Sequence, residues 1–117
     1  MKVFRCLFAA SAALCLAATP ILAQDYTGRY AVTLVTDTGT CEVKINWSVG
    51  VVDGRIDESG LFVRTTGQVN AKGQVALKVV KGSETLAASG LLSHQGGTGT
   101  WTSPSRDCSG RWQAAKV

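Results

Sequence analysis

The sequence predicts an all-β fold: a small antiparallel meander of about eight strands that closes into an up-and-down barrel. Three observations lead to this prediction. Hydrophobic and polar residues alternate with a period of two over most of the chain after residue 26. Turn-forming residues recur roughly every 10 to 16 positions between these runs, as expected for consecutive hairpins. No window has a convincing helical repeat. An open β-sandwich is the alternative architecture.

The first half of the domain contains two clear alternating runs. Tyr30, Val32 and Leu34 alternate with polar or small residues, which predicts a strand over residues 27–36. In residues 41–49, every second residue is hydrophobic and the others are Glu, Lys, Asn and Ser, which predicts a strand over 41–51. Asp53-Gly54 is a strong hairpin signal and separates this run from expected strands at 54–58 and 61–69.

The second half continues the pattern. The turn signals at residues 70–73 and 81–82 bound a predicted strand over 74–81, and further strands are expected at 84–92, 97–102 and 108–115. In the last of these, Cys108, Gly110, Trp112 and Ala114 share one face. Gly97 and Gly99 precede Trp101, and we interpret them as making room for Trp101 and Trp112 inside a narrow barrel. The alternative is that these glycines open a slot for a ligand.

Residues 1–23 are predicted to be a secretory signal peptide. Lys2 and Arg5 give a positive start, residues 6–18 are apolar, and the segment ends on Ala23 after a helix-breaking proline. The apolar run is shorter than the roughly 20 residues of a membrane-spanning helix, so no membrane span is expected after cleavage. Residues 24–117 would then form a single domain in the periplasm or the medium of a Gram-negative bacterium.

Cleavage would leave two of the four cysteines, Cys41 and Cys108. In a small domain of an oxidising compartment, two cysteines are expected to form a disulfide. Both lie at positions that alternation assigns to the core, which supports the same pairing. Their spacing does not match the C-x-x-C pattern of a redox-active pair.

The composition argues against several function classes. Without the signal peptide, ten basic and eight acidic residues leave a net charge of only +2, and the basic residues form no patch, so nucleic-acid binding is not expected. One histidine and two distant cysteines do not make a metal site. His94 has no motif that would supply a nucleophile and an orienting acid, so we do not expect an enzyme. Asp57 and Glu58, adjacent on a strand, would point to opposite faces and cannot act as a glycosidase pair.

The patterns Gly97-Thr98-Gly99-Thr100-Trp101, Cys108-Ser109-Gly110-Arg111-Trp112-Gln113-Ala114 and Tyr26-Thr27-Gly28-Arg29-Tyr30 resemble those of a group of short secreted bacterial proteins. Some members of this group carry labels that mention haem utilisation or large exoproteins. The resemblance implies haem as one candidate ligand, with His94, or else Tyr30 or Tyr26, as the axial ligand. The few large side chains weigh against a haem pocket, and no cofactor is our first expectation. At the level of fold, the chain is also similar to avidin-like and lipocalin-like barrels and to small secreted barrels that inhibit metalloproteases.

The sequence therefore predicts a non-enzymatic binding protein whose partner is a small apolar ligand or an envelope or secreted protein. Trp101, His94 and Tyr30 are the predicted contact residues. Trp47 and Trp112 are assigned to the core. Two alternatives stay open: a protease inhibitor that acts through residues 24–29, and a purely structural envelope protein.

Overall fold

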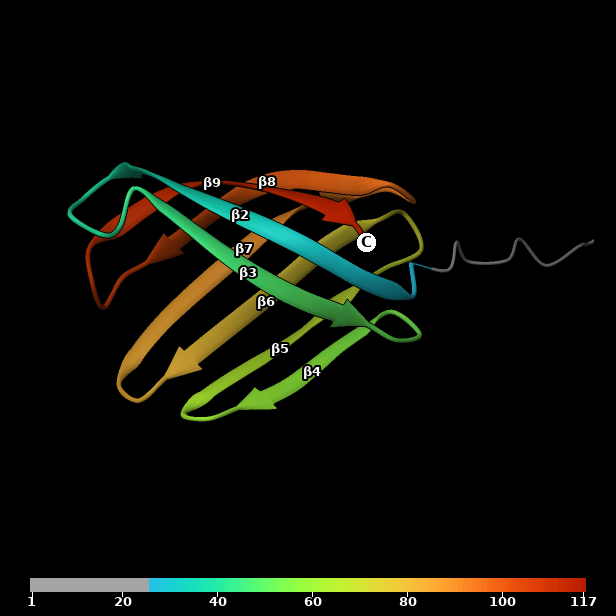
Figure 1. The fold of residues 1–117 in the computed structure, drawn as a ribbon, viewed down its shortest axis with the longest axis horizontal. Helices are drawn as coiled ribbons and strands as arrows, with labels where there is room; N and C mark the ends of the chain where they lie inside the picture. The colour runs from blue at the N-terminus through green and yellow to red at the C-terminus, as the bar shows by residue number, and fades with distance from the viewer. Residues whose placement is uncertain (1–25) are drawn as a thin grey trace, which may run out of the picture.

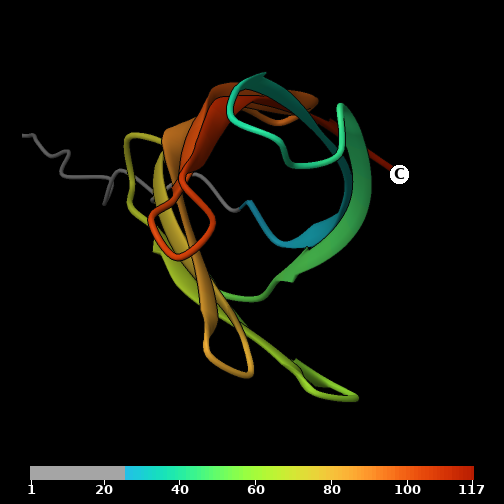
Figure 2. The same cartoon turned by 90° about the vertical axis from the view of Figure 1, so that its left-hand side faces the viewer.

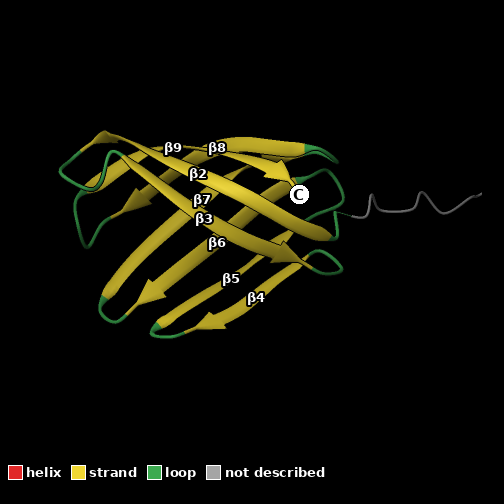
Figure 3. Cartoon of the chain, in the orientation of Figure 1, coloured by secondary structure: helices red, strands yellow, loops and turns green. Residues whose placement is uncertain are grey.

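A computed structural model describes residues 26–117, which form eight antiparallel strands and contain no helix (Figure 3). The predicted signal peptide at 1–23 lies outside these residues. The strands are β2 (Gly28–Thr38), β3 (Lys44–Val51), β4 (Arg55–Gly60), β5 (Val63–Val69), β6 (Gln74–Lys81), β7 (Glu84–Leu92), β8 (Gly96–Ser103) and β9 (Cys108–Lys116). They form a nearly closed barrel, which confirms the predicted fold class (Figure 1). Within the described part of the chain, no helix could span a membrane.

The barrel closes between its first and last strands. The sheet order is β3-β2-β9-β8-β7-β6-β5-β4, so β2 pairs with both β3 and β9. The consecutive strands β3 and β4 form no ladder. The main-chain pairing between them is limited to one isolated bridge between Val52 and Arg55, the two residues that flank the Asp53-Gly54 turn. We call this unpaired boundary between β3 and β4 the seam. Viewed along the barrel, the hairpins β4–β5 and β6–β7 extend away from the ring of the remaining strands (Figure 2).

The alternation of hydrophobic and polar residues correctly predicts which side chains face the interior of the barrel. Tyr30 and Leu34 of β2, Val49 and Val51 of β3, and Trp112 of β9 are all buried. Trp112 lies against the inner face of β8 and β7, where its indole Nε1 donates a hydrogen bond to the Ser89 carbonyl oxygen at 3.1 Å.

This placement of Trp112 depends on two glycines. A Cβ atom at Gly99 would lie 2.5 Å from the indole Nε1, and one at Gly90 would lie 2.7 Å from Cζ2. The expectation that Gly99 makes room for a tryptophan is therefore confirmed. Gly97 instead lies beside Leu92, since a Cβ atom there would be 3.0 Å from the Leu92 Cδ1 atom.

One end of the barrel, which we call the Tyr26 end, is filled by side chains. Tyr26 is only 4% exposed, and its ring stacks on His94 with centroids 5.8 Å apart. The Tyr30 hydroxyl donates a hydrogen bond of 2.7 Å to the Tyr26 carbonyl oxygen. Val75, near the start of β6, and Leu92, at the end of β7, are also buried at this end. The Tyr26 end is therefore closed.

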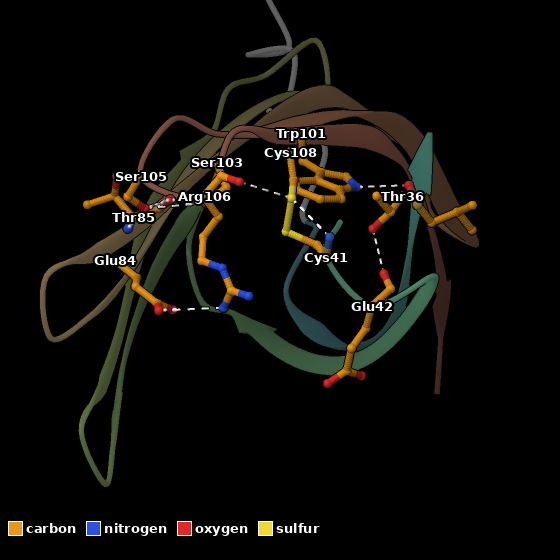
Figure 4. The surroundings of a disulfide bond; sticks show 11 residues. Thr36, Cys41, Glu42, Glu84, Thr85, Trp101, Ser103, Ser105, Arg106 and Cys108 are labelled. Atoms are coloured by element: carbon orange, nitrogen blue, oxygen red, sulfur yellow. Dashed lines mark hydrogen bonds and ion pairs between the residues drawn. A yellow bond between two sulfur atoms is a disulfide. The ribbon is translucent and has the colours of Figure 1, made fainter. Parts of the chain in front are cut away.

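The opposite end, which we call the disulfide end, is held by the predicted bond between Cys41 and Cys108 (Figure 4). Their Cα atoms are 6.1 Å apart, within the usual range for a disulfide. The bond joins the β2–β3 loop to the first residue of β9. Thr36 fixes the same loop, because its hydroxyl donates to the Glu42 carbonyl oxygen at 2.5 Å.

Two strands begin at least two residues later than predicted, and the other bounds differ by two residues or fewer. β3 begins at Lys44, so Cys41 lies in a loop and is half-buried, not at a core-facing strand position. β5 begins at Val63, and Leu61 and Phe62 form the turn before it, at the tip of the β4–β5 hairpin. Both residues are largely exposed, at 84% and 79%. An apolar pair at a hairpin tip reads as strand by composition alone, which explains the error.

Candidate functional site

The candidate site is an apolar cavity inside the barrel. Its volume is about 110 Å³, and six of the eight strands contribute to its wall, all except β5 and β8. The lining side chains are hydrophobic or aromatic and are drawn from the inner face: Tyr30, Val32, Leu34, Ile45, Trp47, Val49, Val51, Ile56, Val75, Leu77, Val79, Leu86, Ala88, Leu92, Trp112 and Ala114.

The cavity lies beyond the filled Tyr26 end. Tyr30, Val51 and Ile56 are at most 3% exposed and form its closed floor. By contrast, Trp47, Leu77 and Leu86 face inward but retain accessible surface. Inward-facing side chains of a filled barrel would be fully buried, so the core of this barrel is incompletely filled on the side of β3, β6 and β7.

The volume limits what the cavity can hold. An apolar protein cavity of about 150 Å³ stays dry and binds benzene. A cavity of about 110 Å³ therefore suits a group of about the size of a small ring or a short alkyl chain. The wall has hardly any groups that could form hydrogen bonds with water, so the cavity favours an apolar molecule over water.

The polar atoms of two of the three aromatic side chains around the cavity, Tyr30 and Trp112, are already paired. Trp112 donates to Ser89, and the Tyr30 hydroxyl donates to the Tyr26 carbonyl. These bonds fix the rings and leave the apolar faces toward the interior. The cavity can therefore select a ligand by size and apolar surface.

The structure does not bring the three predicted contact residues together. Tyr30 lines the floor of the cavity. His94 is exposed in the β7–β8 turn, outside the cavity, with its ring on Tyr26. Trp101 is 2% exposed at the disulfide end and donates a hydrogen bond from Nε1 to the Val35 carbonyl oxygen at 3.2 Å. It is absent from the cavity wall. A ligand role for these residues stays a prediction, and only Tyr30 is placed where the cavity could use it.

The residues present do not fit haem. Drug-sized ligands occupy pockets of about 300–1,000 Å³, well above the volume of this cavity. Among the candidate axial ligands, His94 lies outside the cavity, and the Tyr30 hydroxyl is engaged with Tyr26. Residues 26–117 also contain no group of three or more metal-binding side chains.

The residues 24–29 of the inhibitor hypothesis are described from Tyr26 onward. Tyr26 is buried at its end of the barrel, and the chain enters β2 at Gly28. From Gly28 the main chain is paired with β3, Gly28 facing Val51 and Arg29 facing Gly50. The described part of this segment is thus built into the barrel.

Two residues at the seam were not predicted as functional. Trp47 was assigned to the core; it packs against the core but is only partly buried, and it lines both the cavity and a groove at the seam. Thr65 lines the same groove and is only 3% exposed. The sequence held a signal for Thr65, because it is the polar member of the inward-facing series Val63, Thr65, Gly67 and Val69.

Comparison with known protein families, curated proteins and solved structures finds no match for this chain.

Proposed function

We propose that this protein is a secreted or periplasmic binding protein, without enzymatic activity, that holds a small apolar molecule or group inside its barrel. The observation that carries the proposal is the apolar cavity of about 110 Å³ between a closed floor and a partly exposed wall. The disulfide is consistent with an oxidising compartment.

The physical basis of binding is the burial of apolar surface. Transfer of apolar area from water contributes roughly 25 cal/mol per Å², and the barrel supplies a preformed wall for it. Little reorganisation is needed, because the strands are held in register by their ladders and by the disulfide. Selectivity comes from volume, so large planar ligands are excluded and small rings or short chains are accepted.

The test is a thermal-shift and tryptophan-fluorescence titration of the oxidised protein with toluene. At a hundred times its dissociation constant, a ligand adds about 2.7 kcal/mol to the stability. For a domain of this size the melting temperature should rise by roughly 10 °C or more. Trp47 and Trp112 line the cavity, so their emission should change as toluene binds.

A matched pair of variants locates the site. Ala88 lines the cavity, whereas its neighbour Ala87 is exposed on the outer face of β7. Ala88→Leu should fill the cavity and abolish the toluene shift, and Ala87→Leu should leave it unchanged. Leu77→Phe, which adds volume from β6, provides a second filling variant. No shift in the wild-type protein, or an equal shift in all four proteins, would overturn the proposal.

A further inference from the structure

A second feature lies at the seam, next to the cavity. A groove of about 580 Å³ runs between β3 on one side and β4 and β5 on the other. It exists because β3 and β4 separate after the Val52–Arg55 bridge. Its lining is mainly polar and consists of Arg29, Asn46, Trp47, Ser48, Glu58, Ser59, Gly60, Val63 and Thr65.

Thr65 is the unusual member of this lining. Thr65 is only 3% exposed, and within residues 26–117 its hydroxyl forms no hydrogen bond. Burying a hydroxyl without a partner costs roughly 1–3 kcal/mol in proteins. Most buried polar side chains have a partner, so an unpaired one in a groove wall indicates a hydrogen bond that a bound molecule would complete.

The groove and the cavity adjoin at Trp47, because its side chain belongs to the lining of both. A molecule that spans the two spaces would keep its apolar part among the inward-facing side chains and its polar part at Thr65. The cavity wall is otherwise apolar, so the polar part would lie on the groove side of Trp47, where Thr65 is buried.

The charges of the groove balance. Arg29 donates to the Glu58 carboxylate at 2.6 Å and to the Ser48 hydroxyl at 2.8 Å, so the two ionised groups of the lining neutralise each other. The uncharged groups beside them are hydroxyls and one carboxamide, which both donate and accept hydrogen bonds, and the Trp47 indole, which donates. A neutral head group that also donates and accepts matches this lining better than an ion.

From these observations we infer that the seam groove binds the neutral hydroxyl or amide head of an amphipathic small molecule whose apolar part occupies the cavity. This inference rests on the proposed function and extends it to the chemical class of the ligand. Thr65 is the residue that distinguishes such a ligand from a purely apolar one.

The test compares benzyl alcohol with toluene, which share a ring of the size that the cavity suits and differ in the hydroxyl. Dissociation constants are measured for the wild-type protein, Thr65→Val, Thr65→Ser and Thr66→Val. Thr65→Val keeps the shape and removes the hydroxyl, and Thr65→Ser keeps the hydroxyl. Thr66 faces the opposite side of β5 from Thr65 and serves as the matched control.

Thr65→Val should weaken benzyl alcohol binding by about three- to tenfold, the worth of one hydrogen bond, and change toluene binding by less than about twofold. Thr65→Ser and Thr66→Val should bind both probes as the wild-type protein does. Benzylammonium and benzoate should bind more weakly than benzyl alcohol.

The outcomes separate the two proposals. If toluene binds but Thr65→Val affects both probes equally or neither, the role of the groove is wrong and the cavity proposal stands. Tighter binding of either charged probe would also overturn the inference about a neutral head. If neither toluene nor benzyl alcohol binds the wild-type protein, both proposals are wrong.

Discussion

Arg29 of β2 reaches over Gly50 of β3 to Glu58 of β4, where its guanidinium and the carboxylate lie 2.6 Å apart. A Cβ atom at Gly50 would lie 2.7 Å from the Glu58 Oε2 atom and 2.8 Å from the Arg29 Nη2 atom. The ion pair thus crosses the seam at a point where β3 has no side chain. It links two strands that main-chain hydrogen bonds leave unjoined, and it lies at the wall of the groove described above.

Removal of the Glu58 charge should loosen the seam with a small loss of overall stability. Glu58→Gln is expected to lower the free energy of unfolding by about 0.5 kcal/mol, because both partners are partly exposed and such pairs contribute little. Amide exchange should accelerate more in β3 and β4 than in β6 and β7. Urea unfolding and hydrogen exchange measure the two effects.

The control for Glu58→Gln is Asp57→Asn. Asp57 pairs with Arg64 at 3.1 Å on the adjacent strand, so this ion pair does not cross the seam. Asp57→Asn should leave exchange in β3 unchanged. Faster exchange in β3 for both variants would show that the seam does not depend on the Arg29–Glu58 pair.

Loss of the disulfide should be far more costly. The bond closes a loop with a sequence separation of 67 residues, which corresponds to about 4 kcal/mol in the chain-entropy model. Cys41→Ser is therefore expected to lower the melting temperature by roughly 20 °C. Calorimetry with and without a reductant measures the effect. The reductant should lower the melting temperature of the wild-type protein and not that of Cys41→Ser. A negligible loss caused by the substitution, or by the reductant in the wild-type protein, would contradict the prediction.

The Asp37–Arg111 pair should make stability depend on acidity. Arg111 donates two hydrogen bonds to the Asp37 carboxylate, at 2.8 and 2.9 Å. These hydrogen bonds, more than the opposite charge, lower the pKa of Asp37 from its ordinary value of 3.8. A carboxyl whose pKa is lower in the folded state contributes stability above pH 3.8, and this contribution is lost as the pH falls through the folded-state pKa.

Asp37→Asn should therefore melt below the wild-type protein at neutral pH, and the difference should shrink as the pH falls below 3.8. Thermal unfolding between neutral and strongly acidic pH tests this. A difference that stays constant over the whole range would mean that the stability difference does not arise from ionisation of Asp37.

The inner glycines can be tested in the same way. At Gly99 an added Cβ atom would meet the indole of Trp112 and the backbone of Ser89, neither of which can move freely. Gly99→Ala is expected to cost about 1–3 kcal/mol, the usual cost of overpacking. At Gly60 the nearest atom would be the Val63 carbonyl oxygen, 3.9 Å away, so Gly60→Ala should change stability by less than about 0.5 kcal/mol. Denaturant unfolding of the two variants measures the difference, and equal losses would contradict the packing argument.

The strands could be predicted well from the sequence because inward-facing hydrophobic residues alternate with outward-facing polar residues along each of them. The strands at 74–81 and 84–92 have the expected bounds, and both cysteines were paired correctly. Alternation reports which face a residue occupies and not which strand lies beside it. The pairing of β2 with β9, and the lack of a ladder between β3 and β4 despite a strong Asp53-Gly54 turn, therefore had no signal in the pattern.

The candidate site was harder to predict for the same reason. Trp47 and Trp112 both occupy inward positions, yet Trp112 is buried and Trp47 is only partly buried at the seam. The difference arises from the neighbours that closure of the barrel gives to each strand. Trp101 and His94 were chosen by residue type and lie away from the cavity wall. Whether they contact a partner stays a prediction.

The tip of the β4–β5 hairpin provides the last prediction. Phe62 has a positive φ of 68° and is 79% exposed. This left-handed conformation costs a side chain with a Cβ atom roughly 1–2 kcal/mol, whereas asparagine adopts it more readily. Phe62→Asn should therefore stabilise the protein by about 1 kcal/mol and raise the melting temperature by roughly 5 °C. Leu61 is equally exposed, at 84%, but φ there is not positive, so Leu61→Asn should change stability by less than about 0.5 kcal/mol. Thermal unfolding of the two variants decides the matter, because a loss of stability in Phe62→Asn would mean that the phenyl ring makes contacts worth more than the strain of its backbone.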